Sequence, residues 1–194
     1  MKNFIISGII LLLASCGQNA ELQGPADQMR FVNYVKSIRD AVNASEKDKG
    51  NRSILLDNGV ISTKAYVKDS LSLKFDSWHA TLVEIIEKPA SIEINLSIPL
   101  DSSNKSAQKS IILSSMLQIS KNKMIQGLKV RDQVKISGNF IEKEGFIDID
   151  NYSDYKFSKN VFDNPEFKIE LLSIEYRECY SAACHPCRQA RPMH

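Results

Sequence analysis

Ser91–Ile98, with the sequence SIEINLSI, is the stretch that decides the fold. Every second position in it is apolar: Ile92, Ile94, Leu96 and Ile98. Successive side chains of a β-strand point to opposite faces of the sheet, so this alternation predicts a half-buried antiparallel strand. Pro99 follows and closes the strand. A β-sheet with one covered face is therefore the centre of the predicted structure.

A later segment repeats the pattern. Val130–Phe140, VRDQVKISGNF, places four residues on one face: Val134, Ile136, Gly138 and Phe140. Gly138 is a candidate bulge or sharp bend, because glycine inside a strand often marks such a site. Lys143–Gly145 then turns the chain into Phe146–Ile149, which predicts a hairpin between these two segments.

Four further segments have strand character: Leu71–Phe75, Trp78–Ile86, Ser110–Leu113 and Phe167–Leu171. Asn164-Pro165 supplies an entry turn for the last of them. A weakly helical or irregular crossover is expected in the region of Met116, Ile119 and Met124.

A helix is predicted before the strands. One apolar face of period 3.6 is formed by Phe31, Tyr34, Val35, Ile38, Ala41 and Val42. This spacing predicts an amphipathic helix from about Ala26 to Ala44, which packs on the sheet or closes a barrel end. Ser45–Arg52 is expected to be a charged break, and the strand region is expected to follow Asn58-Gly59.

The 194 residues, 43% hydrophobic and 25% charged, fit one ordinary globular domain. One helix, five or six strands and one long crossover predict an α+β, mainly β fold. The specific expectation is an N-terminal amphipathic helix packed on a small five- to six-stranded OB-like barrel that spans residues 25–176.

The N-terminus has the pattern of an export signal. Lys2 precedes a largely apolar run, Phe4–Ala14. Eleven helical residues reach only about 17 Å, less than the ~30 Å hydrocarbon core, so a removable signal peptide over residues 1–15 is expected instead of a membrane-spanning helix. The segment Leu13-Ala14-Ser15-Cys16 resembles the lipobox of bacterial lipoproteins.

The lipobox resemblance implies that Cys16 carries a thioether-linked diacylglycerol and, on its freed amine, a further acyl chain such as palmitate. Residues 16–24 then form a flexible tether between the lipid and the domain. Gly17 stands where aspartate would resemble an inner-membrane retention signal. The implied location is the bacterial cell envelope, with the outer membrane favoured and the domain facing the periplasm.

Several motifs of the mature chain also occur together in a known group of proteins. They are Phe31-Val32 with Val35, Ala41–Asn43, Arg52, Trp78, LKVRDQVKISGNF and NPEFKIELLSI. As a set, over most of Gln28–Ile174, they resemble a family of small uncharacterised OB-like bacterial exported or phage-associated proteins. Arg131-Asp132 departs from the Gly-Asp typical of that family. The resemblance implies a fold and assigns no catalytic residue.

Charge and motifs narrow the function classes. The chain has 25 basic and 23 acidic residues, a net charge of +2, so no general attraction to nucleic acid is expected. It contains no GxSxG, HExxH, P-loop or dinucleotide motif. Asp76-Ser77-Trp78-His79 holds triad residue types, but neighbours in one strand point to opposite faces and cannot form a relay. No catalytic residue and no cofactor are therefore assigned.

Residues 177–194 form a cysteine-rich tail. Cys179, Cys184 and Cys187 have the spacing C-x4-C-x2-C, and His194 ends the sequence. One disulfide with a leftover thiol is the favoured interpretation in an oxidising envelope. A Cys3His zinc site that uses His194, a redox C-x-x-C pair and a tail with no site are the alternatives.

Two weaker candidate sites lie between residues 148 and 157. Asp148, Asp150 and Asp154 offer oxygen ligands without the spacing of a calcium loop. Tyr152, Tyr155 and Phe157 could form an aromatic platform for a sugar or a base, against the commoner role of covering a core.

The favoured function is a non-catalytic, lipid-anchored envelope module that binds an envelope protein or a cell-wall component. The alternative is a thiol- or metal-dependent activity carried by the tail cysteines.

Overall fold

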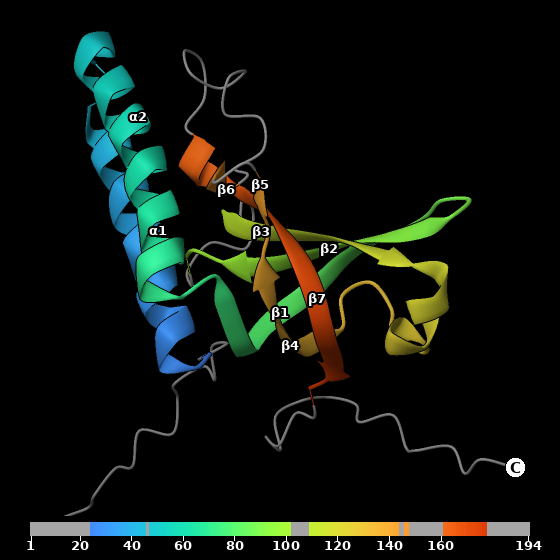
Figure 1. The fold of residues 1–194 in the computed structure, drawn as a ribbon. Coiled ribbons are helices and arrows are strands. Elements are labelled where there is room, and N and C mark those ends of the chain that lie inside the picture. Colours follow the sequence, from blue (N-terminus) through green and yellow to red (C-terminus); the bar gives the residue numbers. More distant parts are fainter. Residues whose placement is uncertain (1–23, 46, 102–108, 144–145, 148–160, 178–194) are drawn as a thin grey trace, which may run out of the picture.

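The computed structural model describes residues 24–45, 47–101, 109–143, 146–147 and 161–177. Within them a hairpin of two helices lies beside a closed five-stranded barrel (Figure 1). The predicted α+β class with a small barrel is confirmed at this level.

The barrel strands are β1 (Lys74–Glu87), β2 (Ser91–Pro99), β3 (Ser110–Gln118), β4 (Gln133–Phe140) and β7 (Glu166–Tyr176). They close in the order β1-β2-β3-β7-β4, with β4 returning to β1. β3 and β7 are parallel, and the other four neighbouring pairs are antiparallel.

β2 confirms the strand predicted at Ser91–Ile98. Its residues alternate between half-buried and buried along the whole strand, and the four predicted inward residues are buried. Phe167 and Ile169 of β7 are buried in the same way, as predicted. β3 begins at Ser110 as expected but continues to Gln118, so Met116 is a strand residue with an exposed side chain.

Gly138 marks an irregular point of the barrel, as predicted. Its partner strand β7 gains one residue between the pairs Ser137–Ser173 and Gly138–Leu171. The register of β1 also shifts opposite this position. A Cβ on Gly138 would collide with the Glu170 carbonyl oxygen and lie 2.7 Å from Phe75 Cζ, so only glycine fits where the strands bend.

Helix α1 spans Ala26–Ala44, the predicted bounds. Phe31, Val35 and Val42 are buried, whereas Ala41, which was expected on the same face, is exposed. Gln28 holds the start of the helix against β1: its amide donates to the His79 carbonyl oxygen (2.6 Å) and accepts from the His79 N–H (2.8 Å). The side chain thus replaces a neighbouring strand at this point of β1.

A second helix, α2 (Lys49–Ala65), corrects the prediction of a charged break followed by strand. Asp48 caps it by accepting from the Asn51 N–H (3.1 Å). Asn58-Gly59, a turn-forming dipeptide in many sequences, lies inside the helix. Glycine occupies position 59 because a larger residue would not fit there. A Cβ on Gly59 would lie 2.6 Å from Ile38 Cγ2 and 2.9 Å from Phe162 Cε2.

The chain between α2 and β1 also differs from the prediction. One π-helical segment, η1 (Tyr66–Ser70), follows α2, and Leu71 and Leu73 precede the barrel strand instead of belonging to it. Ser72 and Leu73 have φ of 51° and 61°, which breaks any strand alternation there.

Short elements complete the fold. The expected crossover contains a 3-10 helix, η2 (Ile119–Ile125), and η3 (Val161–Asp163) precedes β7. A hairpin forms at the predicted turn, but it pairs β5 (Glu142–Lys143) with β6 (Phe146–Ile147). β4, which was expected to pair with the segment after this turn, pairs with the barrel strands β1 and β7 instead. Arg131 has φ of 80° in the turn before β4, in the left-handed region that favours glycine.

Candidate functional site

The barrel interior is a packed core. Five aromatic side chains from α1 and three strands contact one another at centroid distances of 5.2–6.0 Å: Phe31, Phe75, Trp78, Phe140 and Phe167. All five are almost fully buried. Interiors of small barrels are filled by side chains in this way, so binding surfaces have to be sought on the outside.

A row of polar side chains crosses the outside of four strands. Cross-strand pairing aligns Glu84 of β1, Asn95 of β2, Ser114 of β3 and Lys168 of β7. Glu93 of β2 and Glu166 of β7 occupy neighbouring outward positions. We name these six residues the outer polar face. The alternation along each strand places these side chains on the outside of the barrel, although Ser114 is only 3% exposed there.

Hydrogen bonds order this face. Asn95 Nδ2 donates to Glu84 Oε2 (2.9 Å), and Lys168 Nζ forms an ion pair with Glu166 Oε1 (2.8 Å). Lys88, from the turn before β2, pairs with Glu93 Oε2 at 2.6 Å, and its ammonium holds the pKa of the Glu93 carboxyl below its usual range. Asn95 Oδ1 is buried and accepts no hydrogen bond from the described residues.

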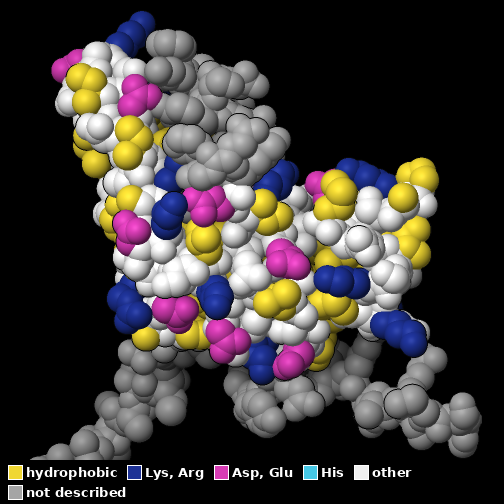
Figure 2. All heavy atoms as spheres, in the orientation of Figure 1, with side chains coloured by type: hydrophobic (Ala, Val, Ile, Leu, Met, Phe, Trp, Pro, Cys, Tyr) yellow, Lys and Arg dark blue, Asp and Glu magenta, His cyan; other side chains and the backbone are white. Residues whose placement is uncertain are grey.

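The charge of the outer polar face is negative. It carries three carboxylates, of Glu84, Glu93 and Glu166, against the Lys168 ammonium, and Lys88 adds a second amine at its edge. Figure 2 shows acidic and basic side chains interspersed over the side of the molecule that faces the viewer. Such a surface suits neutral polar or amine-bearing ligands better than a polyanion.

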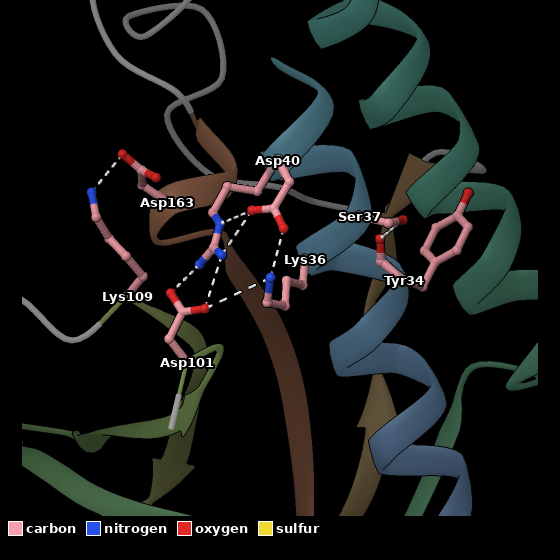
Figure 3. A network of polar contacts seen from close by, with 8 residues as sticks. Tyr34, Lys36, Ser37, Asp40, Asp101, Lys109 and Asp163 are labelled. Atoms are coloured by element: carbon pink, nitrogen blue, oxygen red, sulfur yellow. Dashed lines mark hydrogen bonds and ion pairs between the residues drawn. The ribbon is translucent and has the colours of Figure 1, made fainter. Parts of the chain in front are cut away.

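An ion-pair cluster around the buried Arg39 joins α1 to the chain just after β2 (Figure 3). Arg39 donates to both carboxylate oxygens of Asp101, at 2.6 and 2.9 Å, and to Asp40 Oδ1 at 2.9 and 3.1 Å. Lys36 pairs with Asp40 at 2.6 Å. The Arg39 guanidinium lowers the pKa of Asp101, and Lys36 followed by Arg39 lowers that of Asp40. Because its donors bind carboxylates of its own chain, Arg39 stabilises the fold here.

A neighbouring ion pair acts in the same region. Lys109, immediately before β3, donates to Asp163 Oδ2 of η3 at 2.6 Å (Figure 3). Asp101 and Lys109 lie just before and just after residues 102–108, so both flanks of that segment are attached to other elements. Sequence inspection missed the Arg39–Asp101 pair because 62 positions separate the two residues.

Asp76, Ser77 and His79, which are residues of catalytic-triad type in β1, do not form a proton relay. Ser137 Oγ donates to Asp76 Oδ1 (2.7 Å), Ser77 N–H donates to Ser137 Oγ (3.0 Å), and the Trp78 indole donates to Asp27 Oδ2 (2.8 Å). Ser77 has φ of 56°, where the register of β1 shifts. Trp78 is a fully buried core residue.

The predicted lipidation and metal or disulfide residues lie outside the described residues. These are Cys16, Cys179, Cys184, Cys187 and His194, and the candidates between residues 148 and 157 do so as well. Among the residues that the structure describes, no three His, Cys, Asp or Glu side chains form a group that could hold a metal ion.

No family model, curated protein or solved structure matches this chain. The resemblances noted in the sequence therefore stay predictions. None of the helices within the described ranges has both the length and the apolar character needed to span a membrane.

Proposed function

We propose that this chain is a lipid-anchored protein of the bacterial envelope whose OB-like barrel is a non-catalytic binding module. Its partner is an envelope protein or a cell-wall component, bound on the outer polar face. The strand order, with one parallel pair among four antiparallel ones, supports the OB-like assignment. OB folds are five-stranded Greek-key barrels that bind ligands on the face of their second and third strands.

The observation that carries this proposal is the polar row on the outside of a filled barrel. β2 and β3, which contribute Asn95 and Ser114 to that row, are the second and third strands along the chain. Carboxylates, amides and hydroxyls can hydrogen-bond the hydroxyl and amide groups of a glycan, or the amines of a protein segment. The excess of carboxylates disfavours nucleic acid, whose binding depends on phosphate neutralisation.

The lipobox-like sequence supports the anchor. Two or three acyl chains on Cys16 would hold the protein on a membrane, since each buried methylene contributes about 0.8 kcal/mol. Residues 17–24 can span at most about 28 Å when fully extended. The start of α1 would therefore stay within that distance of the bilayer, which brings outer-membrane proteins and the cell wall within reach of the domain.

Binding is tested with charge reversal on the outer polar face. The double variant Glu84→Lys/Glu166→Lys should lose at least tenfold in affinity for purified peptidoglycan, or lose a partner captured from intact envelopes by the wild type. Glu175→Lys is the matched control, because Glu175 is an exposed β7 glutamate that also pairs with a lysine, Lys135, at 2.9 Å. Equal binding by the double variant and the wild type would refute the proposed surface.

The anchor is tested separately. Cys16→Ser should stall processing or release the protein from membranes. A variant that is processed and still fractionates with membranes would contradict the lipoprotein assignment.

The alternative thiol- or metal-dependent activity is addressed by replacing Cys179, Cys184 and Cys187 with serine. A binding module keeps its affinity in this triple variant. If the triple variant fails to replace the wild-type protein in cells, and the charge-reversed variant replaces it, the alternative is favoured.

A further inference from the structure

The chain between η2 and β4 contains a strained turn at one end of the barrel. The Asp132 N–H donates to the Lys129 carbonyl oxygen (3.0 Å), and Asp132 Oδ2 accepts from the Lys129 N–H (2.8 Å), so residues 129–132 form a closed β-turn. Its two central residues, Val130 and Arg131, are exposed. The φ of 80° at Arg131 is that of a type II turn, in which glycine is the usual residue at this position. Such strain is often found where a side chain has a function.

The end of β7 lies beside this turn. Tyr176 pairs with Val134 of β4, and the Arg177 N–H donates to the Gln133 carbonyl oxygen at 2.9 Å, one residue after the turn. The Tyr176 side chain is 62% exposed, and that of Val130 is 49% exposed. We name the five residues of this surface the basic end of the barrel: Lys129, Val130, Arg131, Tyr176 and Arg177.

The basic end has a positive net charge. Its three cationic side chains form no ion pair with another described residue. One carboxylate, that of Asp132, belongs to the turn, and the nearby Glu175 is already paired with Lys135 at 2.9 Å. The sequences that continue the chain on either side, residues 17–24 and 178–194, together contain two acidic and two basic residues, so they do not change this balance.

Helix α1 begins at the same end of the barrel. Gln28, in its first turn, hydrogen-bonds the backbone of His79 in β1. In the barrel His79 pairs with Lys135 of β4, which pairs in turn with Glu175 near the end of β7. Figure 1 shows α1 beginning and β7 ending on the same, lower side of the molecule. The chain that leads back to Cys16 therefore joins the domain at the end that carries the basic residues.

We infer that the basic end binds anionic phospholipid headgroups and holds the barrel end-on against the membrane in which Cys16 is anchored. This placement rests on the proposed function, which supplies the anchor. Residues 17–24 span at most about 28 Å, so the end that they join is the one within reach of the bilayer. Lys and Arg side chains are attracted to an anionic leaflet within a Debye length, and tyrosine favours the level of the headgroups.

The end-on placement leaves the outer polar face accessible. That face lies on the side wall of the barrel, whereas the basic end is formed by the turn before β4 and the last residues of β7. Its three carboxylates are repelled by an anionic leaflet, and the three cations of the basic end are attracted to it. Both effects favour the same orientation, in which a cell-wall or protein partner can reach the side of the barrel.

Quenching of tryptophan fluorescence by brominated lipids tests the orientation. Trp78 is the only tryptophan of the chain and is fully buried, so its emission is a constant background. The lipidated full-length Tyr176→Trp variant is placed on vesicles of phosphatidylglycerol and phosphatidylethanolamine with brominated chains. It should be quenched several times more strongly than Ile54→Trp. Ile54 is the matched control, because it is 59% exposed and lies near the start of α2, at the far end of the helical hairpin. Equal quenching at the two positions would overturn the orientation.

Charge reversal tests the contact with the headgroups. Lys129→Glu/Arg131→Glu should reduce the quenching of the Tyr176→Trp protein to the level of the control position. Lys47→Glu/Lys49→Glu changes the net charge equally, at exposed residues between α1 and the first turn of α2, and should leave the quenching unchanged. Quenching that survives the first double variant, or that is lost equally in both, would overturn recognition of headgroups by the basic end.

The contact with lipid can also be decided without the anchor. Cys16→Ser protein should co-sediment with phosphatidylglycerol vesicles, and not with phosphatidylcholine vesicles, at about 10 mM salt, where the Debye length is ~30 Å. Each basic residue strengthens such binding about fivefold, so Lys129→Glu/Arg131→Glu should weaken it by about tenfold or more. Absence of binding to phosphatidylglycerol would refute the inference whatever the fate of Cys16. Binding by the Cys16→Ser protein together with wild-type protein that leaves the membrane fraction of cells would refute the anchor and support the basic end.

Discussion

Replacing Arg39 by methionine tests the ion-pair cluster that joins α1 to β2. The Arg39 side chain is only 7% exposed and binds Asp101 in bidentate fashion. Methionine keeps most of the apolar volume, so the loss is mainly electrostatic. Hydrogen bonds to charged groups contribute about 1.5–3 kcal/mol, and breaking a buried pair costs about 3–5 kcal/mol. Asp101 is 30% exposed and can be partly rehydrated, so we expect a loss of about 2–4 kcal/mol.

The two carboxylates should contribute unequally. Asp101→Asn leaves Arg39 paired with Asp40, so it should cost less than Arg39→Met. Asp40 is half exposed and Asp40→Asn leaves the bidentate pair intact, so it should cost least. Urea denaturation of the three variants and the wild type measures this order. A loss below about 0.5 kcal/mol for Arg39→Met would refute the assignment of a stabilising role.

The stability that Arg39 contributes should depend on pH. In the folded protein Arg39 lowers the pKa of Asp101, and Lys36 and Arg39 lower the pKa of Asp40, below the ordinary value of an aspartate. A carboxylate with a lowered folded pKa adds stability above its unfolded pKa and loses it as pH falls through the folded pKa. The difference between wild type and Arg39→Met should therefore shrink between about pH 5 and pH 2. A difference that stays constant over this range would contradict the electrostatic explanation.

Three further substitutions test the packing by thermal and urea denaturation. Phe140→Ala should lower the free energy of unfolding by about 3–5 kcal/mol, because it opens a cavity in the aromatic core. Leu172→Ala, on the exposed bulge of β7, should lower it by less than about 0.5 kcal/mol. Arg131→Gly should stabilise the protein by about 0.5–1 kcal/mol, since φ of 80° strains an L-residue by more than the added chain entropy of glycine, and Arg131→Ala should give no gain. Gly59→Ala should cost about 1–2 kcal/mol despite the better helix propensity of alanine, because its Cβ would lie 2.6 Å from Ile38; a stabilised variant would refute the close packing of α2.

The barrel could be predicted from the sequence because its strands are covered on one face. β2 and β4 alternate without interruption, and Gly138 stands out as the position that cannot follow the pattern. α1 was predictable for the same reason, with period 3.6 in place of period 2.

The functional surfaces were less predictable because they depend on strand order. The polar positions of β2 are visible in the sequence, but only the pairing of β3 with β7 places Ser114 beside Lys168. Likewise Arg39 and Asp101 show no relation until α1 lies beside the end of β2. Long-range pairing, not local pattern, creates both arrangements.

The sequence did not predict helix α2, and the failure has one physical cause. Helix prediction depends on apolar residues that gather on one side, and α2 has them on two. Ile54 and Ile61 on the outer side interrupt the period set by Leu56 and Val60 on the inner side. With Asn58-Gly59 between them, the segment resembles a break in the chain. A helix with apolar residues on both sides gives this signal, so the irregularity that hid α2 in the sequence comes from the exposed Ile54 and Ile61 and not from the side that packs on the rest of the chain.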